Sequence, residues 1–187
     1  MSQAKVLTQN EIDQVLRYVS TTRYPKRNRL LVVSSFFSGM RVGELAKLKL
    51  SDVLNNDGSI KNEIKLTAQQ TKGNHARTVF VNEKLRSELA SYIASHKAND
   101  TQAALFCTEK GGAFTPNTLA QWFFWMYRKA GIVASSHSGR RTFITTLANK
   151  GISVRVLASL AGHKNIAVTQ HYIDVNDGMK REAVELI

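Results

Sequence analysis

Six side chains, spread over most of the sequence, have the chemical types needed to break a phosphodiester. They are two arginines, a lysine, two histidines and a tyrosine: Arg41, Lys72, His137, Arg140, His163 and Tyr172. The cationic groups can neutralise phosphate oxygens and transfer protons, and a tyrosine can supply an oxygen nucleophile. The set therefore predicts attack on a phosphate ester without a metal ion.

Each requirement of that reaction suits one of these residue types. A nucleophile must reach phosphorus, two non-bridging oxygens must be held while charge builds, and the leaving 5′-oxygen needs a proton. A guanidinium fork binds phosphate oxygens in pairs and keeps its charge, whereas an ammonium group releases a proton more readily. A phenol is a weak nucleophile until its surroundings activate it. Arginine thus suits the oxygens, lysine the leaving group and tyrosine the attack.

Each of the six residues lies in a short sequence context. The contexts are Gly39-Met40-Arg41-Val42-Gly43-Glu44, Thr71-Lys72-Gly73-Asn74, His137-Ser138-Gly139-Arg140, Leu160-Ala161-Gly162-His163 and Gln170-His171-Tyr172-Ile173. Each alone is common, as a solvated cation, a histidine at a helix end or a core tyrosine. Together and in this order, from about Leu7 to the C-terminus, they resemble the catalytic domain of the tyrosine recombinase (phage integrase) family.

The resemblance implies a role for each cation. Arg41 and Arg140 would clamp the scissile phosphate, with Glu44 buttressing Arg41. His137 would also hold the phosphate and assist proton movement at the nucleophile. His163 would donate a hydrogen bond to a non-bridging oxygen.

The resemblance also implies the covalent step. Lys72, on a hairpin, would protonate the departing 5′-oxygen, and Tyr172 would form a 3′-phosphotyrosyl bond that a second strand's 5′-hydroxyl can reverse. The expected activity is site-specific recombination of DNA: inversion, integration or excision. No metal or other cofactor is implied, and His137, His163 and His171 lack the close pairing and carboxylates of a metal site.

The same resemblance suggests the partners and the layout. The partners would be double-stranded DNA, other protomers in a tetramer on synapsed DNA, and accessory DNA-bending proteins. Residues 1–187 are expected to form one catalytic domain without an N-terminal DNA-gripping domain, as in the fimbrial-switch invertases, although excision from a longer protein is the alternative. Residues 177–187 are a candidate exchange segment, because Ala183, Val184, Leu186 and Ile187 form an apolar stripe.

Bulk composition agrees with a DNA-binding domain. The 187 residues carry a formal net charge of +12, with 43% hydrophobic residues, which favours a globular protein with an anionic partner. Cys107 is the sole cysteine, so a disulfide framework is excluded. No signal peptide or bilayer-length apolar run is evident. We therefore expect a cytoplasmic, nucleoid-associated protein without a membrane partner.

Further basic residues are candidate DNA contacts, although a solvated surface is the ordinary interpretation of such side chains. They are Arg23, Lys26, Arg27, His75 and Arg141. The run from Trp122 to Trp125 is interpreted as core, not as a platform for stacked bases.

Periodicity predicts an α+β fold that is mostly helical, with a small three-stranded antiparallel sheet. Thr8 and Glu11 form a capping box, Pro25 can open a second helix, and a third short helix is expected to carry Arg41. Strands are expected at 64–67 and 78–81, with Lys72 near the hairpin tip. Helices are expected at 83–98 and 117–130, from Ser138 as the cap to Gly151, at 154–160, at 168–172 and from 177 onward.

Two other functions fit parts of the sequence. Residues 154–172 would pass for a helix-turn-helix with a recognition helix starting near Asn165, so a non-catalytic DNA-binding regulator is the main alternative. A non-catalytic regulator would give no role to Arg41, Lys72 or Tyr172. A type IB topoisomerase would share the chemistry and rejoin the same strand, but it usually carries longer insertions before the tyrosine.

Overall fold

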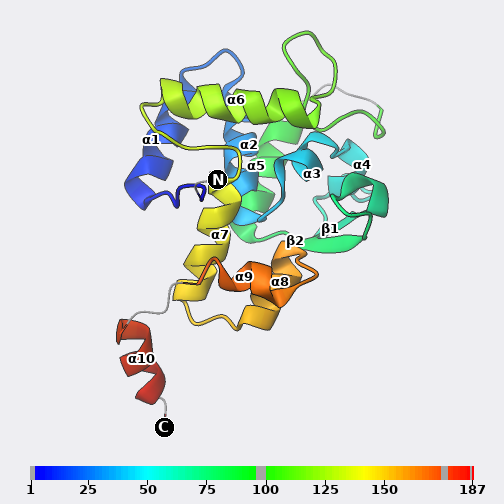
Figure 1. Cartoon of the computed structure of the whole chain (residues 1–187). Helices are drawn as coiled ribbons and strands as arrows, with labels where there is room; N and C mark the ends of the chain where they lie inside the picture. The colour runs from blue at the N-terminus through cyan, green and yellow to red at the C-terminus, as the bar shows by residue number, and fades with distance from the viewer. Residues whose placement is uncertain (1–2, 96–99, 174–176, 186) are drawn as a thin grey trace.

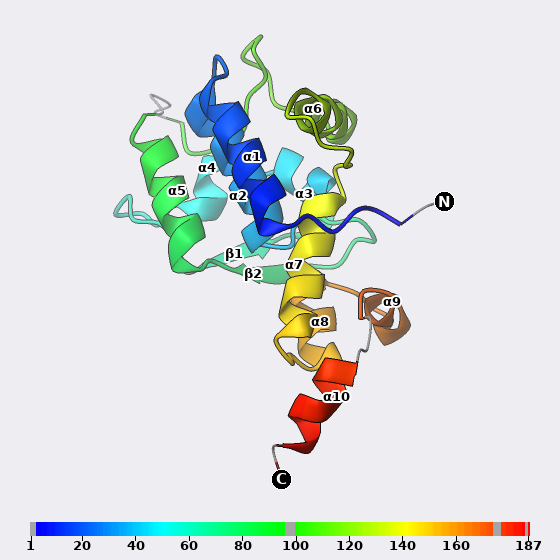
Figure 2. The same ribbon diagram turned by 90° about the vertical axis from the view of Figure 1, so that its left-hand side faces the viewer.

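The computed structural model describes residues 3–95, 100–173, 177–185 and 187, which form a mostly helical domain with a small sheet on one side (Figures 1 and 2). Helix α1 spans Gln9–Ser20 and α2 spans Pro25–Phe37. The predicted capping box is present, since Thr8 and Glu11 bind each other's backbone N–H groups. Pro25 opens α2, whose apolar residues face every direction. Accordingly α2 is central and packs against α1, α5 and α7.

Strands β1 (Glu63–Leu66) and β2 (Arg77–Phe80) form an antiparallel pair in which Glu63 lies opposite Phe80. Both begin one residue earlier than predicted. The prediction of a third strand is wrong, because the sheet has two strands in the part of the chain that the structure describes. Helix α4 (Leu50–Val53) runs up to the turn at Asn55, so only Leu54 is left to pair, in a single bridge to Ile60.

The elements between these are short. Helix α3 spans Val42–Ala46, and Arg41 occupies its N-cap position instead of lying inside the helix. A 3₁₀ turn, η1, covers Ala68–Gln70 before the hairpin. Helix α5 spans Glu83–Ile93, which is shorter than predicted, and residues 96–98 of that prediction lie outside the described residues. Helix α6 spans Pro116–Lys129, one residue earlier than predicted at each end.

The last helices are α7 (Ser138–Asn149), α8 (Val154–Ala161), α9 (Ile166–Gln170) and α10 (Asp177–Val184). His137, not Ser138, occupies the N-cap position of α7, and the Ser138 hydroxyl instead accepts a hydrogen bond from the Ser135 N–H. The predicted helix at 168–172 begins and ends two residues earlier, so Tyr172 follows α9. In both views α10 lies at the lower end of the molecule, beyond the ends of α7 and α8 (Figures 1 and 2).

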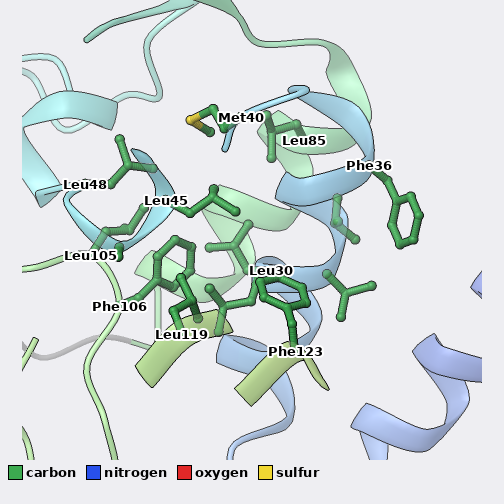
Figure 3. Packing of buried hydrophobic residues seen from close by; sticks show 14 of the residues in the cluster. Leu30, Phe36, Met40, Leu45, Leu48, Leu85, Leu105, Phe106, Leu119 and Phe123 are labelled. Atoms are coloured by element: carbon green, nitrogen blue, oxygen red, sulfur yellow. The ribbon is translucent and has the colours of Figure 1, made fainter. Parts of the chain in front are cut away.

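The hydrophobic core lies between α2, α3, α5 and α6 and includes Leu30, Leu45, Leu85 and Phe123 (Figure 3). Phe124 and Trp125 are 39% and 57% exposed, so their assignment to the core was wrong. Four consecutive helical residues point in directions about 100° apart and cannot all face one side. No helix among the described residues has the length and hydropathy needed to cross a membrane.

Candidate active site

All six predicted residues, together with Glu44, border one cavity of about 560 Å³. Segments far apart in the sequence supply them: Arg41 precedes α3, Lys72 comes from the β1–β2 hairpin, and Arg140 lies in the first turn of α7. His163 follows α8 and Tyr172 follows α9. The fold therefore gathers at one place the side chains that the sequence contexts singled out.

Arg41 is held through both its backbone and its side chain. Its N–H donates to Glu44 Oε2 at 2.7 Å, and its Nη1 lies 3.1 Å from Glu44 Oε1. The chain reaches Arg41 through Gly39, which has a φ of +60° and lies against the ring of Phe143. A Cβ on Gly39 would lie 2.6 Å from that ring, so both conformation and space require glycine here.

Arg77, which the sequence analysis did not select, shares Glu44 with Arg41. Its Nε and Nη2 donate to the two oxygens of Glu44 at 3.3 and 2.7 Å. The Glu44 side chain is 1% exposed. Burial by itself raises the pKa of Glu44, but the hydrogen bonds and charges of Arg77 and Arg41 outweigh that effect and lower it.

A sequence signal for Arg77 did exist. Side chains two apart on a strand share a face, and Arg77 precedes Val79 and Val81, which are both buried. The alternation therefore places a charged side chain on the buried face, where it requires a partner.

Arg140 lies at the centre of the cluster and is 5% exposed. Its Nη1 donates to the Gly39 carbonyl at 2.6 Å, and its Nη2 donates to the Ala161 carbonyl at 2.6 Å. In the part of the chain that the structure describes, Arg140 forms no ion pair. Burial, followed by the charges of Arg41 and Arg77, lowers the pKa of Arg140.

Three consecutive carbonyls at the end of α8 receive the three arginines. Arg77 Nη1 donates to Leu160 O at 2.8 Å, Arg140 Nη2 to Ala161 O, and Arg41 Nη2 to Gly162 O at 3.3 Å. The last carbonyls of a helix lack intrahelical partners and form the negative end of its dipole. The α8 terminus is thus a common anchor for all three guanidinium groups.

His163 follows that anchor, and its tautomer follows from its partners. Arg140 Nη2 lies 2.8 Å from His163 Nε2, and Thr169 Oγ1 lies 2.9 Å from Nδ1. Since a guanidinium can only donate, Nε2 accepts and Nδ1–H donates to Thr169. Burial, with the charges of Arg140, Arg41 and Arg77, lowers the pKa of His163 to about 4. The ring is therefore neutral at pH 7.

His137 lies at the rim of the cavity, where its ring is only partly enclosed by protein. That enclosure, together with the charges of Arg140, Lys72 and Arg41, lowers the pKa of His137. Lys72 and His137 border the same cavity, so the positive charge of the hairpin lysine acts on the site.

Lys72 is exposed on a tight hairpin loop. The Thr71 hydroxyl donates to the His75 carbonyl at 2.7 Å and accepts from the His75 N–H, which closes the neck of the loop. Gly73 and Asn74 both have positive φ angles, which glycine and asparagine tolerate best. The described residues include no hydrogen-bond or ion-pair partner of the Lys72 ammonium group. The side chain therefore borders the cavity without a fixed partner, on a loop whose neck is closed by hydrogen bonds.

Tyr172 borders the cavity and is half-buried. Its ring stacks on His163, with centroids 5.7 Å apart and an interplanar angle of 26°. The guanidinium of Arg141 lies over the ring, 5.3 Å from its centroid. The Thr145 hydroxyl donates to the Tyr172 carbonyl at 3.3 Å. The candidate nucleophile is thus positioned by contacts from α7 and from the turn after α8.

Comparison with known proteins identifies the fold and the family. Residues 5–179 match the model of the phage integrase family. The chain belongs to the phage integrase family. The tyrosine recombinase XerA of Pyrococcus furiosus is 29% identical over 97% of this chain and 61% of its own length. The chain therefore spans about three fifths of the length of such relatives.

Solved structures of integrase-family proteins have the same fold. The crystal structure of XerA recombinase matches all of this chain and 66% of its own, with 26% identity and a TM-score of 0.77. The Tn1549 transposon integrase in complex with a circular intermediate DNA matches all of this chain and 67% of its own, with 20% identity and a TM-score of 0.79. The resemblance drawn from the sequence is thereby confirmed, as is the mostly helical catalytic-domain fold with a small antiparallel sheet.

The predicted DNA contacts of this integrase-family chain are not all brought to the cavity. Arg23 precedes α2, Lys26 and Arg27 lie in its first turn, and none of the three borders the cavity. Arg27 is 7% exposed and donates to the Cys107 carbonyl at 2.8 Å. His75 is exposed at the hairpin neck. Among the described residues, no three His, Cys, Asp or Glu side chains are placed to hold a metal ion.

Proposed function

We propose that this chain cleaves and rejoins DNA strands at a specific site through a covalent bond between Tyr172 and a 3′-phosphate. One observation carries the proposal: the guanidinium groups of Arg41 and Arg77 both bind the single carboxylate of Glu44, and Arg140 lies close to this cluster, beside a tyrosine. Two positive charges are left unbalanced in a largely buried cluster. A phosphodiester brings one negative charge, and its transition state develops a second.

Burial, followed by the same excess of positive charge, lowers the pKa values of Arg140, His163 and His137. Donors that are fixed before the reaction stabilise developing charge without reorganising, and removing one typically costs about 10²–10³ in rate. The α8 carbonyls fix these donors, so the site favours the charge distribution of phosphoryl transfer.

The Tyr172 oxygen attacks phosphorus and loses its proton to neutral His137, while the P–O5′ bond breaks. Lys72 gives a proton to the leaving 5′-oxygen, and Arg41, Arg140 and His163 hold the non-bridging oxygens. Attack by a 5′-hydroxyl on the phosphotyrosine reverses every transfer and rejoins a strand.

His163 must change its hydrogen bonding to take part. Its Nε2 accepts from Arg140 in the free chain, so donation to a phosphate oxygen requires a proton on that nitrogen. A bound phosphate favours that proton because a nearby negative charge raises the pKa of an imidazole.

A second cavity, of about 730 Å³, offers a path for the flanking DNA backbone. Lys47 and Gln70 border both cavities, so the two are adjacent. The ammonium groups of Lys47 and Lys49 bind the Gln69 carbonyl and the Gln102 amide oxygen, and neither lysine pairs with a carboxylate among the described residues. Their charges are therefore available to phosphates next to the scissile one.

The partners are part of this proposal. The names of the matched relatives, a XerA recombinase and an integrase in complex with DNA, support double-stranded DNA as the substrate. We infer a tetramer on synapsed DNA in the cytoplasm, with accessory DNA-bending proteins shaping the synapse.

The C-terminal segment is proposed to couple the protomers. Ala183, Val184 and Ile187 are exposed on or after α10, whereas Leu186 lies outside the described residues. An apolar stripe without cover on its own domain can pack into a neighbour. Deleting residues 177–187 should preserve cleavage and abolish coordinated strand exchange; coordinated exchange by the truncated chain would refute the role.

The test of the function is a trapped adduct. The chain is incubated with nicked duplexes covering its genomic neighbourhood, and denaturing gels are used to find a protein–DNA species. Tyr172→Phe should abolish the adduct and retain binding, whereas Tyr18→Phe, on α1, should leave both unchanged. Tight binding without an adduct would favour a non-catalytic DNA-binding regulator. Rejoining confined to the same strand would favour a topoisomerase.

The regulator alternative needs a recognition helix near Asn165. The five residues of α9 extend only about 7.5 Å, which is short for a recognition helix.

A further inference from the structure

Arg77 connects three segments that carry predicted catalytic groups. It begins β2, five residues after Lys72, and its side chain is 8% exposed. The Nε and Nη2 side of its guanidinium binds both oxygens of Glu44, which also holds Arg41. Its Nη1 binds the Leu160 carbonyl, three residues before His163. A single planar group thus joins the hairpin to α3 and to the end of α8.

The route of the Arg77 side chain is enclosed on the α8 side as well. A Cβ built on Gly162 would lie 2.5 Å from Arg77 Cδ, and Gly162 has a φ of +63°. Glycine at this position therefore lets the arginine stem pass and also ends α8 in the left-handed conformation. The context around His163 is shaped to receive Arg77.

The hairpin depends on this attachment for its position over the site. Within the hairpin, hydrogen bonds between Thr71 and His75 close the neck, so residues 71–75 form one closed loop. Arg77 is two residues beyond that neck, and its three bonds tie the loop to Glu44, which lines the cavity, and to the Leu160 carbonyl at the end of α8. If these bonds are lost, β2 remains paired with β1, but the hairpin is no longer fastened to Arg41 and His163.

We propose that Arg77 is a positioning residue that sets the reach of Lys72 toward the leaving 5′-oxygen by locking the hairpin to Glu44 and to the α8 terminus. The proposal rests on the proposed strand-cleavage function. Arg77 itself does not touch the substrate, because its three bonds are directed into the protein. A lysine cannot replace it fully, since an ammonium group cannot bind a carboxylate through a planar fork and a carbonyl at once.

The experiment compares two leaving groups in single-turnover cleavage by the whole chain. Nicked duplexes carry the cleavage site located by the adduct assay. The scissile phosphate has either a normal 5′-oxygen or a 5′-bridging phosphorothiolate, whose sulfur leaves without a proton. Arg77→Ala should slow cleavage of the oxygen substrate by about 100-fold, because small misplacements of a reacting group have effects of that size. The sulfur substrate should recover most of the loss, as it should for Lys72→Ala.

A second variant distinguishes loss of positioning from loss of the fold. Arg77→Lys keeps a charge beside Glu44, and we expect its melting temperature to stay close to that of the wild type. Its cleavage of the oxygen substrate should fall about tenfold and should recover with sulfur. Arg86→Lys is the matched control, since Arg86 on α5 also binds a backbone carbonyl, that of Ile60 at 2.9 Å, away from the cavity. It should cleave both substrates at the wild-type rate.

The outcomes separate the two proposals. Equal slowing of both substrates by Arg77→Lys, or wild-type cleavage by Arg77→Ala, overturns the positioning role while the proposed function stands. A wild-type chain that forms no adduct with either substrate overturns the proposed function and the positioning role with it. Selective rescue by sulfur in both Arg77 variants supports the role, because general damage to the fold does not depend on the leaving group.

Discussion

Glu44→Gln should destabilise the domain more than any surface charge change. The carboxylate is 1% exposed and is shared by Arg41 and Arg77, with Arg140 nearby. Glutamine keeps the volume and one acceptor oxygen, so no cavity forms and the loss is that of the counter-charge. Breaking a buried ion pair costs about 3–5 kcal/mol, and the retained volume places this change near 3. For a chain of this size, the melting temperature should fall by roughly 6–12 °C.

The measurement is thermal unfolding at pH 7 followed by far-UV circular dichroism. Glu88→Gln is the control, because Glu88 pairs with Arg29 in a more exposed ion pair, at 2.7 Å, and such pairs contribute about 0–1 kcal/mol. If Glu44→Gln melts within 2 °C of Glu88→Gln, Glu44 is not the central counter-charge and the electrostatic argument for the site fails.

The pH dependence of the Glu44 effect has a definite sign. The folded-state pKa of Glu44 lies below its ordinary value of 4.5, so its contribution is fully present above that value. It is lost as the pH falls below 4.5 through the lowered pKa, because the unfolded chain then binds the proton first. The stability difference between wild type and Glu44→Gln should therefore shrink on acidification below pH 4.5. A difference that stays constant would contradict this assignment.

Two further predictions concern DNA binding. Phosphate should raise the pKa of His163 from about 4, so binding takes up a proton and affinity rises as the pH falls from 8 toward 5. His163→Gln should reduce the slope of log Kd against pH, measured by fluorescence anisotropy, by up to one proton; an unchanged slope would refute the linkage. Lys47→Gln should weaken binding similarly for all sequences and lower the slope of log K against log salt by about one, whereas Lys65→Gln, exposed on β1, should not. Equal slopes for Lys47→Gln and the wild type would place the DNA backbone elsewhere.

Local sequence signals determined much of this protein. The Thr8–Glu11 capping box and Pro25 mark the starts of α1 and α2, because a cap and a proline at the first position act within one helical turn. The five contexts around the six site residues were sufficient to identify the family and the cavity's main side chains. These signals are recognisable because each depends on residues only a few positions apart.

Tertiary structure decided how the site is held together. Arg77 lies 83 residues from Leu160 and 33 from Glu44, and nothing in the local pattern around residue 77 names those partners. The sheet kept two strands among the described residues, because α4 ends only one residue before the turn at Asn55. The three arginines converge on the carbonyls of residues 160–162 only once α3, β2, α7 and α8 are packed together. A sequence can show which charges are present, but a buried charge finds its partner through packing, since long-range contacts alone set the distance between them.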